Sequence, residues 1–463
     1  MSGISAPRNW RTAVRRLCLW RFVRPGGHGV FLFFGGDGRA GIGPYIFTVC
    51  KLLSFAISQQ LFILLFVAYF LATAQPGATQ ELKTSGYLKN FFAALDPPSP
   101  EGGSLEGAGS SRLRLRLLWE KRAFAAEVAY ELAPRVQGEM PGSELPRPAP
   151  FSYRAVDLRT WLYPARGSPA GSFAMRHNLD RGILVFSTSW ADFSMGRQAL
   201  AFGSARVLNP TDVFAPFTFE ELDKEERVGV DALRIRLPTG DLSEVDVGVV
   251  FGDEFKGHES AAFLRGRFYL RKTDLTPVVV LFKENLLLGL DVTRALGGAG
   301  YWFEAGYTFA GIATNYCKEE NYVRLSTGLD YSFGRRLYGF VEYHLNGAGT
   351  GRTAAYLSRL GYRAYAEGAV YLLGRHYAAP GFTFQLTPLV ILSAQTLVNM
   401  SDGSAFVSPR LEYSFSDNVF VEVGGFGGLG TGAKIAVGLV PFTPRSEFGL
   451  YPDTYFASMR LYF

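Results

Sequence analysis

Residues 455–463 read Tyr-Phe-Ala-Ser-Met-Arg-Leu-Tyr-Phe, and every second side chain, starting from Tyr455, is apolar. Successive side chains of an extended strand point to opposite faces, so these apolar residues share one face while Ser458 and Arg460 lie on the other. The apolar face consists of Tyr455, Ala457, Met459, Leu461 and Phe463. We therefore expect a final strand with an oily outer face and a polar inner face, which is typical of a β-barrel in lipid.

The same alternation recurs through most of the chain. Between residues 112 and 117 arginine and leucine alternate three times, and charge again lies on one face only at 244–251 and 323–331. A water-soluble sandwich would alternate too. Alternation over about 400 residues without a helical segment instead favours a closed transmembrane barrel, because closure leaves no unpaired strand edge in lipid.

Turn-forming residues divide the alternating segments into an up-and-down antiparallel barrel of about 18 strands, with 16 as the alternative because the strands near 275–295 are the weakest. Short turns alternate with long loops, as in barrels with short periplasmic and long outer connections. An extended piece at Tyr153–Leu162 would break the even number, so we place it inside an outer loop. The strands are expected to begin near residues 84, 112, 122, 180, 193, 228, 243, 261, 275, 285, 301, 321, 337, 374, 388, 404, 418 and 453.

Composition fits this fold. Of 463 residues, 53 are glycine and 15% are aromatic, while only 19% are charged, which is too apolar for disorder and too evenly spread for helical membrane spans. Eight of the 47 Lys and Arg, against one of the 41 Asp and Glu, lie before residue 81, so the rest of the chain is almost neutral. The basic balance therefore gives no reason to expect a nucleic-acid partner.

The basic end predicts a targeting segment. An apolar run at Leu61–Leu71 is followed by Ala72-Thr-Ala74, which is the pattern of a signal peptide; a membrane anchor over 52–73 is the alternative. We expect a signal peptide at 49–74 and a barrel at 75–463. Residues 1–48 would then be a spurious or unstructured extension, with Val49 or Leu52 as the true start, a hypothesis that N-terminal sequencing of a precursor containing them would refute.

A set of short motifs resembles a poorly characterised family of Gram-negative outer-membrane porin-like barrels, which is itself distantly similar to the phosphate-selective and alginate-export porins. Phe202 stands where this family would be expected to have Trp. The resemblance implies an outer-membrane location and a pore. Its motifs are Tyr87–Asn90, Leu179–Arg181, Gly196-Arg-Gln198, Phe202-Gly203, Asn209-Pro-Thr-Asp-Val-Phe214, Pro216, Leu222–Glu225, Gly229–Asp231, Thr387–Leu389 and Asn399–Ser404.

The loop at 200–227 is the candidate constriction. Asn209 and Asp212 are turn formers, but Phe214 and its neighbours Val213, Phe217 and Phe219 are too apolar for an outer loop left in water. We expect the loop to fold inward and narrow the lumen. The alternative is that it packs on the rim as a stabilising plug.

The polar faces of the strands predict a charged lumen. Opposed charges in a pore orient dipolar solutes and tune selectivity, whereas salt bridges holding a filled barrel shut are the alternative interpretation. The candidate pore-lining residues are Arg112, Arg114, Arg116, Glu127, Glu131, Arg234, Arg236, Arg265, Arg267 and Arg324. Further inward charges are expected at Glu244, Asp246, Glu304, Asp330, Glu342, Arg410, Glu412, Glu422 and Arg460.

The sequence contains none of the common catalytic or metal-binding motifs, and His177, His258, His344 and His376 are scattered. We expect no enzyme activity, cofactor or metal, but a channel through which small hydrophilic solutes diffuse across the outer membrane. A non-conducting adhesin or structural barrel is the alternative. The expected partners are outer-membrane lipid, the barrel-assembly machinery acting on the strand that ends at Phe463, and, by analogy with porins, further copies of the chain.

Overall fold

The computed structural model describes residues 22–24, 27–29, 82–96, 106–137, 153–156, 160–164, 172–312, 320–367, 370–434 and 443–463. The chain divides into two units, Met1–Ile63 and Leu64–Phe463. In the first unit β1 (Phe22–Arg24) pairs antiparallel with β2 (Gly27–Gly29). The signal peptide predicted at 49–74 lies outside the described residues, and the prediction for residues 1–48 stays a prediction.

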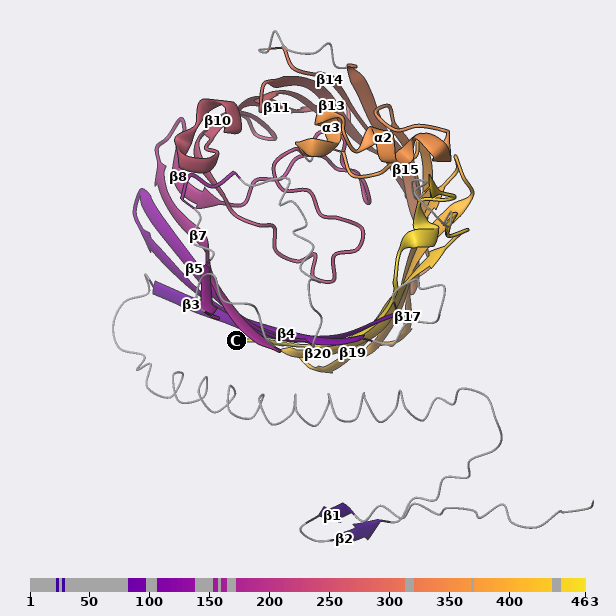
Figure 1. Ribbon diagram of the computed structural model, residues 1–463. Coiled ribbons are helices and arrows are strands. Elements are labelled where there is room, and N and C mark those ends of the chain that lie inside the picture. The colour runs from indigo at the N-terminus through magenta and orange to yellow at the C-terminus, as the bar shows by residue number, and fades with distance from the viewer. Residues whose placement is uncertain are drawn as a thin grey trace, which may run out of the picture. The chain divides into compact units, whose positions relative to one another are not determined.

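The described part of the second unit forms a closed antiparallel barrel of 18 strands (Figure 1). Neighbours along the chain are neighbours in the barrel, and the last strand pairs with the first from Asp453↔Asp96 to Tyr462↔Tyr87. The strands are β3 (Leu82–Asp96), β4 (Glu106–Lys121), β5 (Phe124–Gln137), β7 (Phe173–Ser187), β8 (Asp192–Gln198), β9 (Val230–Gly240), β10 (Ser243–Val250), β11 (Ala261–Leu270), β12 (Thr273–Phe282), β13 (Asn285–Leu296), β14 (Ala299–Phe309), β15 (Tyr322–Phe333), β16 (Leu337–Asn346), β17 (His376–Thr387), β18 (Val390–Asn399), β19 (Ser404–Ser416), β20 (Val419–Leu429) and β23 (Asp453–Tyr462).

This arrangement confirms the predicted barrel and its strand number. The 16-strand alternative is wrong, because β12 and β13 are separate strands that pair from Thr273↔Arg294 to Phe282↔Asn285. These two strands have few polar side chains, so the sequence pattern marks the boundary between them only weakly. The backbone reverses there at Lys283 and Glu284, two non-glycine residues with positive φ.

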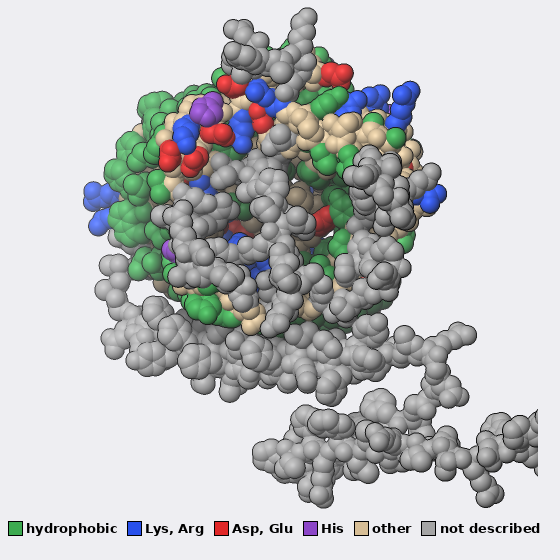
Figure 2. All heavy atoms as spheres, in the orientation of Figure 1, with side chains coloured by type: hydrophobic (Ala, Val, Ile, Leu, Met, Phe, Trp, Pro, Cys, Tyr) green, Lys and Arg blue, Asp and Glu red, His purple; other side chains and the backbone are tan. Residues whose placement is uncertain are grey.

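The outer face of the barrel is apolar and the inner face is polar, as the alternation predicts. On β20 Val423 is 48% exposed while the neighbouring Glu422 is buried, and on β23 Tyr455 is 59% exposed while Ser458 is buried. Figure 2 shows hydrophobic side chains around the flank of the barrel and charged side chains within its opening. An exposed apolar wall is stable only in hydrocarbon, so the barrel is of the transmembrane type.

No helix in the described part of the chain is long and apolar enough to cross a membrane. The expectation of no helical segment at all is nevertheless wrong, because short helices occur in the connections between strands. These are η1 (Asp253–Phe255), η2 (Gly257–Glu259), η3 (Thr353–Ala355), α2 (Tyr356–Arg359), α3 (Arg363–Ala366) and η4 (Phe448–Leu450). The connection after β20 also contains the small pair β21 (Ala433–Lys434) and β22 (Thr443–Pro444).

The extended piece predicted at 153–162 lies in an outer connection, but its end also pairs with a strand of the barrel wall. Strand β8 ends early and pairs with β7 only from Gly182 onward, which leaves the first half of β7 without a neighbour on that side. Strand β6 (Thr160–Tyr163) pairs there with Met175–His177. Nearby, the Asp231 amide donates to the Tyr153 carbonyl at 2.9 Å, so residues 153–156 cover the start of β9.

Candidate channel lumen and its inner loop

The connection from β8 to β9, residues 199–229, runs inside the barrel. In Figure 1 this loop crosses the interior of the ring of strands. Near its start lies Gly203, whose φ is +86° and where a Cβ atom would clash with the Glu304 carboxylate. Only glycine fits this close approach, and it lets the chain turn from the wall into the lumen.

Two carboxylates of the wall hold the first half of this inner loop. Glu304 on β14 accepts hydrogen bonds from the Thr211 amide at 2.8 Å and the Thr211 hydroxyl at 2.7 Å. Glu342 on β16 accepts from the amides of Arg206 at 2.7 Å and Leu208 at 3.0 Å, and from the Trp302 indole at 3.0 Å. The loop backbone therefore finds its acceptors on the inner face of the barrel, while its role as a constriction stays a prediction.

The three residues predicted for the constriction fasten the loop. Asn209 donates to Glu304 at 3.2 Å, and Asp212 accepts from the Phe214 amide at 3.2 Å and forms an ion pair with Arg227. Burial raises the pKa of the Asp212 carboxyl, although Arg227 and the two backbone donors at Phe214 and Ala215 oppose the shift. Phe214 is fully buried, so it does not project into the passage.

Aromatic side chains attach the loop to two sides of the barrel. Phe214 packs edge-on against Phe202 on the loop and Phe263 on β11, with ring centroids 5.2 and 5.8 Å apart. Phe219 packs against Phe406 on β19 and Phe448, at 4.8 and 5.6 Å. The apolar residues that suggested an inward fold are thus the loop's anchors on the wall, because burying them removes their surface from water.

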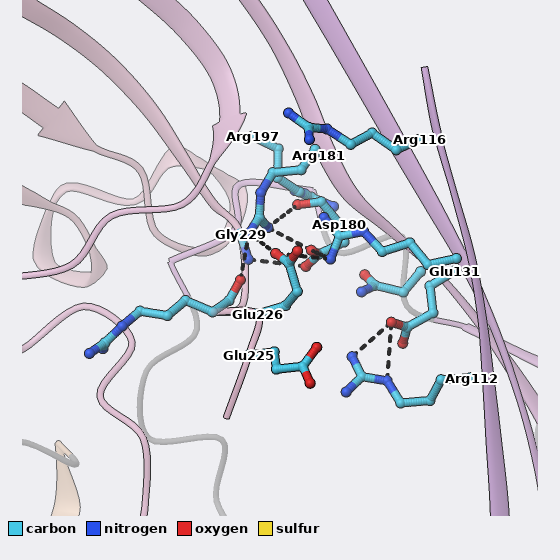
Figure 3. Close-up of polar contacts among 12 residues, drawn as sticks. Arg112, Arg116, Glu131, Asp180, Arg181, Arg197, Glu225, Glu226 and Gly229 are labelled. Carbon is cyan, nitrogen blue, oxygen red and sulfur yellow. Dashed lines mark hydrogen bonds and ion pairs between the residues drawn. The ribbon is translucent and has the colours of Figure 1, made fainter. Parts of the chain in front are cut away.

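The arginines predicted on β4 point inward, and each pairs with an acid. Arg112 lies 2.7 Å from Glu131, and Arg116 lies 2.9 Å from Glu127. Arg114 lies 2.9 Å from Asp180 on β7. Figure 3 shows the Arg112–Glu131 pair on the inner side of the wall, with Asp180 and Arg181 nearby.

The other predicted arginines are also paired. Arg234 and Arg265 both lie 2.7 Å from Asp246, which is fully buried between them. Arg267 lies 3.3 Å from Glu244, and Arg236 lies 3.6 Å from Asp192. Arg324 donates to the Asn209 carbonyl at 3.4 Å. The structure therefore contains the salt bridges of the alternative interpretation, while the pore-lining role of these residues stays a prediction.

Two cavities lined by charged side chains lie between the inner loop and the short turns of β9–β10, β11–β12 and β13–β14. The larger has a volume of about 910 Å³ and is lined by residues including Ser204, Glu244, Arg265, Arg267, Asp274 and Asp291. The second, of about 600 Å³, is lined by residues including Ser204, Arg206, Lys272 and Asp330. Arg267 and Arg206 keep 60% and 51% of their side chains exposed, so the lumen is charged and accessible to solvent in this half.

The sequence alone missed several groups that meet in the lumen, above all Lys89 on β3 and the acids Asp223, Glu225 and Glu226 of the inner loop. The Lys89 side chain is completely buried and its ammonium lies 3.0 Å from Asp223 and 2.7 Å from Glu225. A signal was present, because Tyr87, Lys89 and Phe91 occupy the inward phase of β3. The loop acids carried no periodic signal, since they belong to no strand.

His344 is a hydrogen-bonded residue of the wall, as expected for a lone lumenal histidine. It is buried, and its Nδ1 lies 2.8 Å from the Ser326 hydroxyl. Among the described residues there is no group of three or more His, Cys, Asp and Glu side chains that could hold a metal ion.

No protein-family model and no curated protein sequence matches this chain. Solved structures do match it. The crystal structure of Acinetobacter baumannii OccAB4 is 10% identical, with a TM-score of 0.51 over 84% of this chain and 100% of that one. The outer-membrane protein opdK from Pseudomonas aeruginosa is 8% identical, with a TM-score of 0.50 over the same shares, and its crystal structure with vanillate is 9% identical, also with a TM-score of 0.50. At this identity the likeness establishes the fold, which is that of porin-like barrels of the Gram-negative outer membrane.

Proposed function

We propose that this protein is a porin-like channel through which small hydrophilic solutes cross the outer membrane, and that it has no catalytic activity. One observation carries the proposal: a loop lies inside an 18-strand barrel, next to a polar cavity of about 910 Å³. A barrel of about eight strands is filled by side chains, whereas one of this size leaves an aqueous interior that an inward loop can narrow.

Small anions are the first solutes to test. Around the second cavity the cations Arg206, Lys272 and Arg294 outnumber the acids Asp274 and Asp330, and cationic side chains in a narrow, water-filled passage favour anions. One structure with the same fold, OpdK, was crystallised with vanillate, an aromatic carboxylate. The motif resemblance to phosphate-selective and alginate-export porins also belongs to this proposal, because both groups are named for anionic cargo.

Conductance of the refolded protein in a planar bilayer tests the proposal against a non-conducting adhesin or structural barrel. We expect discrete, reproducible conductance steps in potassium chloride, and a decrease of the current when vanillate is added to one side. A barrel that is folded, as judged by heat-modifiable migration, but produces no steps would support the alternative function.

The proposed partners are membrane lipid along the apolar wall and the barrel-assembly machinery at the seam between β23 and β3. At this seam the Gly86 amide donates to the Phe463 carbonyl at 2.8 Å, and the Phe463 amide donates to the Gly86 carbonyl at 3.0 Å. The terminal aromatic residue thus completes the strand that closes the barrel. A homo-oligomer remains a proposal by analogy with porins.

A further inference from the structure

Three carboxylates of the inner loop, Asp223, Glu225 and Glu226, lie against basic side chains of the barrel wall. We call residues 223–226 the acidic clip. Asp223 lies 3.0 Å from Lys89 and 2.8 Å from Arg112. Lys89 and Arg112 belong to the adjacent strands β3 and β4, so this carboxylate joins two neighbouring strands from inside the lumen.

The other two carboxylates extend the contact along the wall in both directions. Glu225 lies 2.7 Å from Lys89 and 2.7 Å from Arg460 on β23, and it accepts a hydrogen bond from the Tyr462 hydroxyl at 2.6 Å. Glu226 lies 3.3 Å from Arg114 on β4 and 3.2 Å from Arg181 on β7. Figure 3 shows Glu226 close to Arg181 and Asp180.

The clip balances the charge of this side of the lumen. Among the described residues, the ion-paired network around the clip joins six cations of the wall to only four carboxylates of the wall. The wall cations are Lys89, Arg112, Arg114, Arg181, Arg410 and Arg460. The wall carboxylates are Glu131, Asp180, Glu412 and Glu422. The wall side of this network therefore has two more cations than carboxylates, and the clip, with three carboxylates and Lys224, has two more carboxylates than cations.

These contacts are stronger than ordinary surface ion pairs. The Lys89 side chain is completely buried, and a buried ammonium is stable only with charged partners beside it. Although burial opposes ionisation, hydrogen bonds from Lys89, Tyr462 and Arg460 hold the pKa of Glu225 below its ordinary value. Glu225 is therefore held in its anionic form by its neighbours.

We propose that the acidic clip sets the ion selectivity of the channel by cancelling the excess positive charge of the wall from β19 to β7. A lumen without the clip carboxylates would attract anions, because its uncompensated cations would raise the local anion concentration. The proposal rests on the proposed function, since only a conducting pore has a selectivity. It identifies Asp223, Glu225 and Glu226, which belong to no strand, as determinants of that selectivity.

Reversal potentials in a potassium chloride gradient test this proposal. In the triple variant Asp223→Asn, Glu225→Gln and Glu226→Gln, we expect the chloride-to-potassium permeability ratio to rise about threefold or more. Glu120→Gln is the matched control. This exposed acid lies near the turn between β4 and β5, 3.1 Å from Lys83, and belongs to no ion pair of the network around the clip.

The single variant Glu225→Gln guards against misfolding of the triple variant, because Lys89 keeps Asp223 and Arg460 keeps Glu412 and Glu422. We expect a smaller shift of the same sign. An unchanged ratio in a conducting, folded clip variant, or an equal shift in Glu120→Gln, would overturn the proposed role of the clip while leaving the channel intact. A wild-type protein that does not conduct would overturn both proposals.

Discussion

At the scale of single residues, a buried carboxylate organises the outer connections. Glu447, next to η4, accepts hydrogen bonds from the Tyr377 hydroxyl at 2.5 Å, the Asn399 amide at 2.7 Å and the Leu373 backbone at 2.8 Å. Burial is the main cause that raises the pKa of Glu447 to about 7, with Asp402 adding to the shift and the donors opposing it. This group therefore titrates close to neutral pH.

A raised carboxyl pKa makes these connections more stable in acid. The stabilisation is fully present below the ordinary pKa of 4.5 and is lost as the pH rises through about 7. We expect the opening free energy at the Leu373 and Gly374 amides, obtained from hydrogen-exchange rates corrected for the pH dependence of intrinsic exchange, to fall by roughly 3 kcal/mol between pH 5 and pH 8. Glu447→Gln should abolish this dependence, and Glu320→Gln, at an exposed acid of another outer connection, should keep it. A pH dependence that survives in Glu447→Gln would refute the assignment.

At the scale of elements, the inner loop has no secondary structure of its own, so its backbone must find hydrogen-bond acceptors elsewhere. The Glu342 carboxylate is the acceptor for three consecutive backbone amides, those of Arg206, Val207 and Leu208. The wall strands and the inner loop thus form one unit, although the residues in contact are up to 237 positions apart in sequence.

Removing this acceptor should release the first half of the loop. In Glu342→Ala the three amides and the Trp302 indole lose their partner, and each unsatisfied buried donor costs ~1–3 kcal/mol unless water reaches it. We expect a lower thermal unfolding midpoint, together with larger and noisier single-channel currents. Glu120→Ala, at an exposed acid near a periplasmic turn, should change neither quantity. Currents as quiet as those of the wild type would show that other contacts hold the loop.

At the scale of the whole barrel, stability depends on keeping the outer wall free of charge. Val423 lies on the lipid-facing side of β20, next to the lumenal Glu422. Arginine there should destabilise the folded barrel by ~2–4 kcal/mol, because a cation near the middle of the bilayer loses its hydration. Leu242→Arg is the matched control, since Leu242 is 68% exposed in a periplasmic turn and can keep a cation in water. Unfolding titrations in lipid vesicles measure both changes, and equal losses would argue against an apolar band at Val423.

The sequence was sufficient to predict the barrel because the alternation of side chains and the turn residues are local features of the chain. Alternation along each strand decides which face meets lipid, and turn residues decide where the chain reverses. This is why the closed barrel and its strand number could be predicted, including the separate strands β12 and β13.

Only the tertiary structure decided how the inward charges combine. Lys89, Arg460 and Glu225 are distant in sequence and meet because the last strand closes on the first and the inner loop is laid across that seam. Periodicity tells which face a side chain lies on, but an ion pair depends on the position of its partner in space. The sequence therefore determined a charged lumen, and the closed barrel with its inner loop determined which of those charges are cancelled.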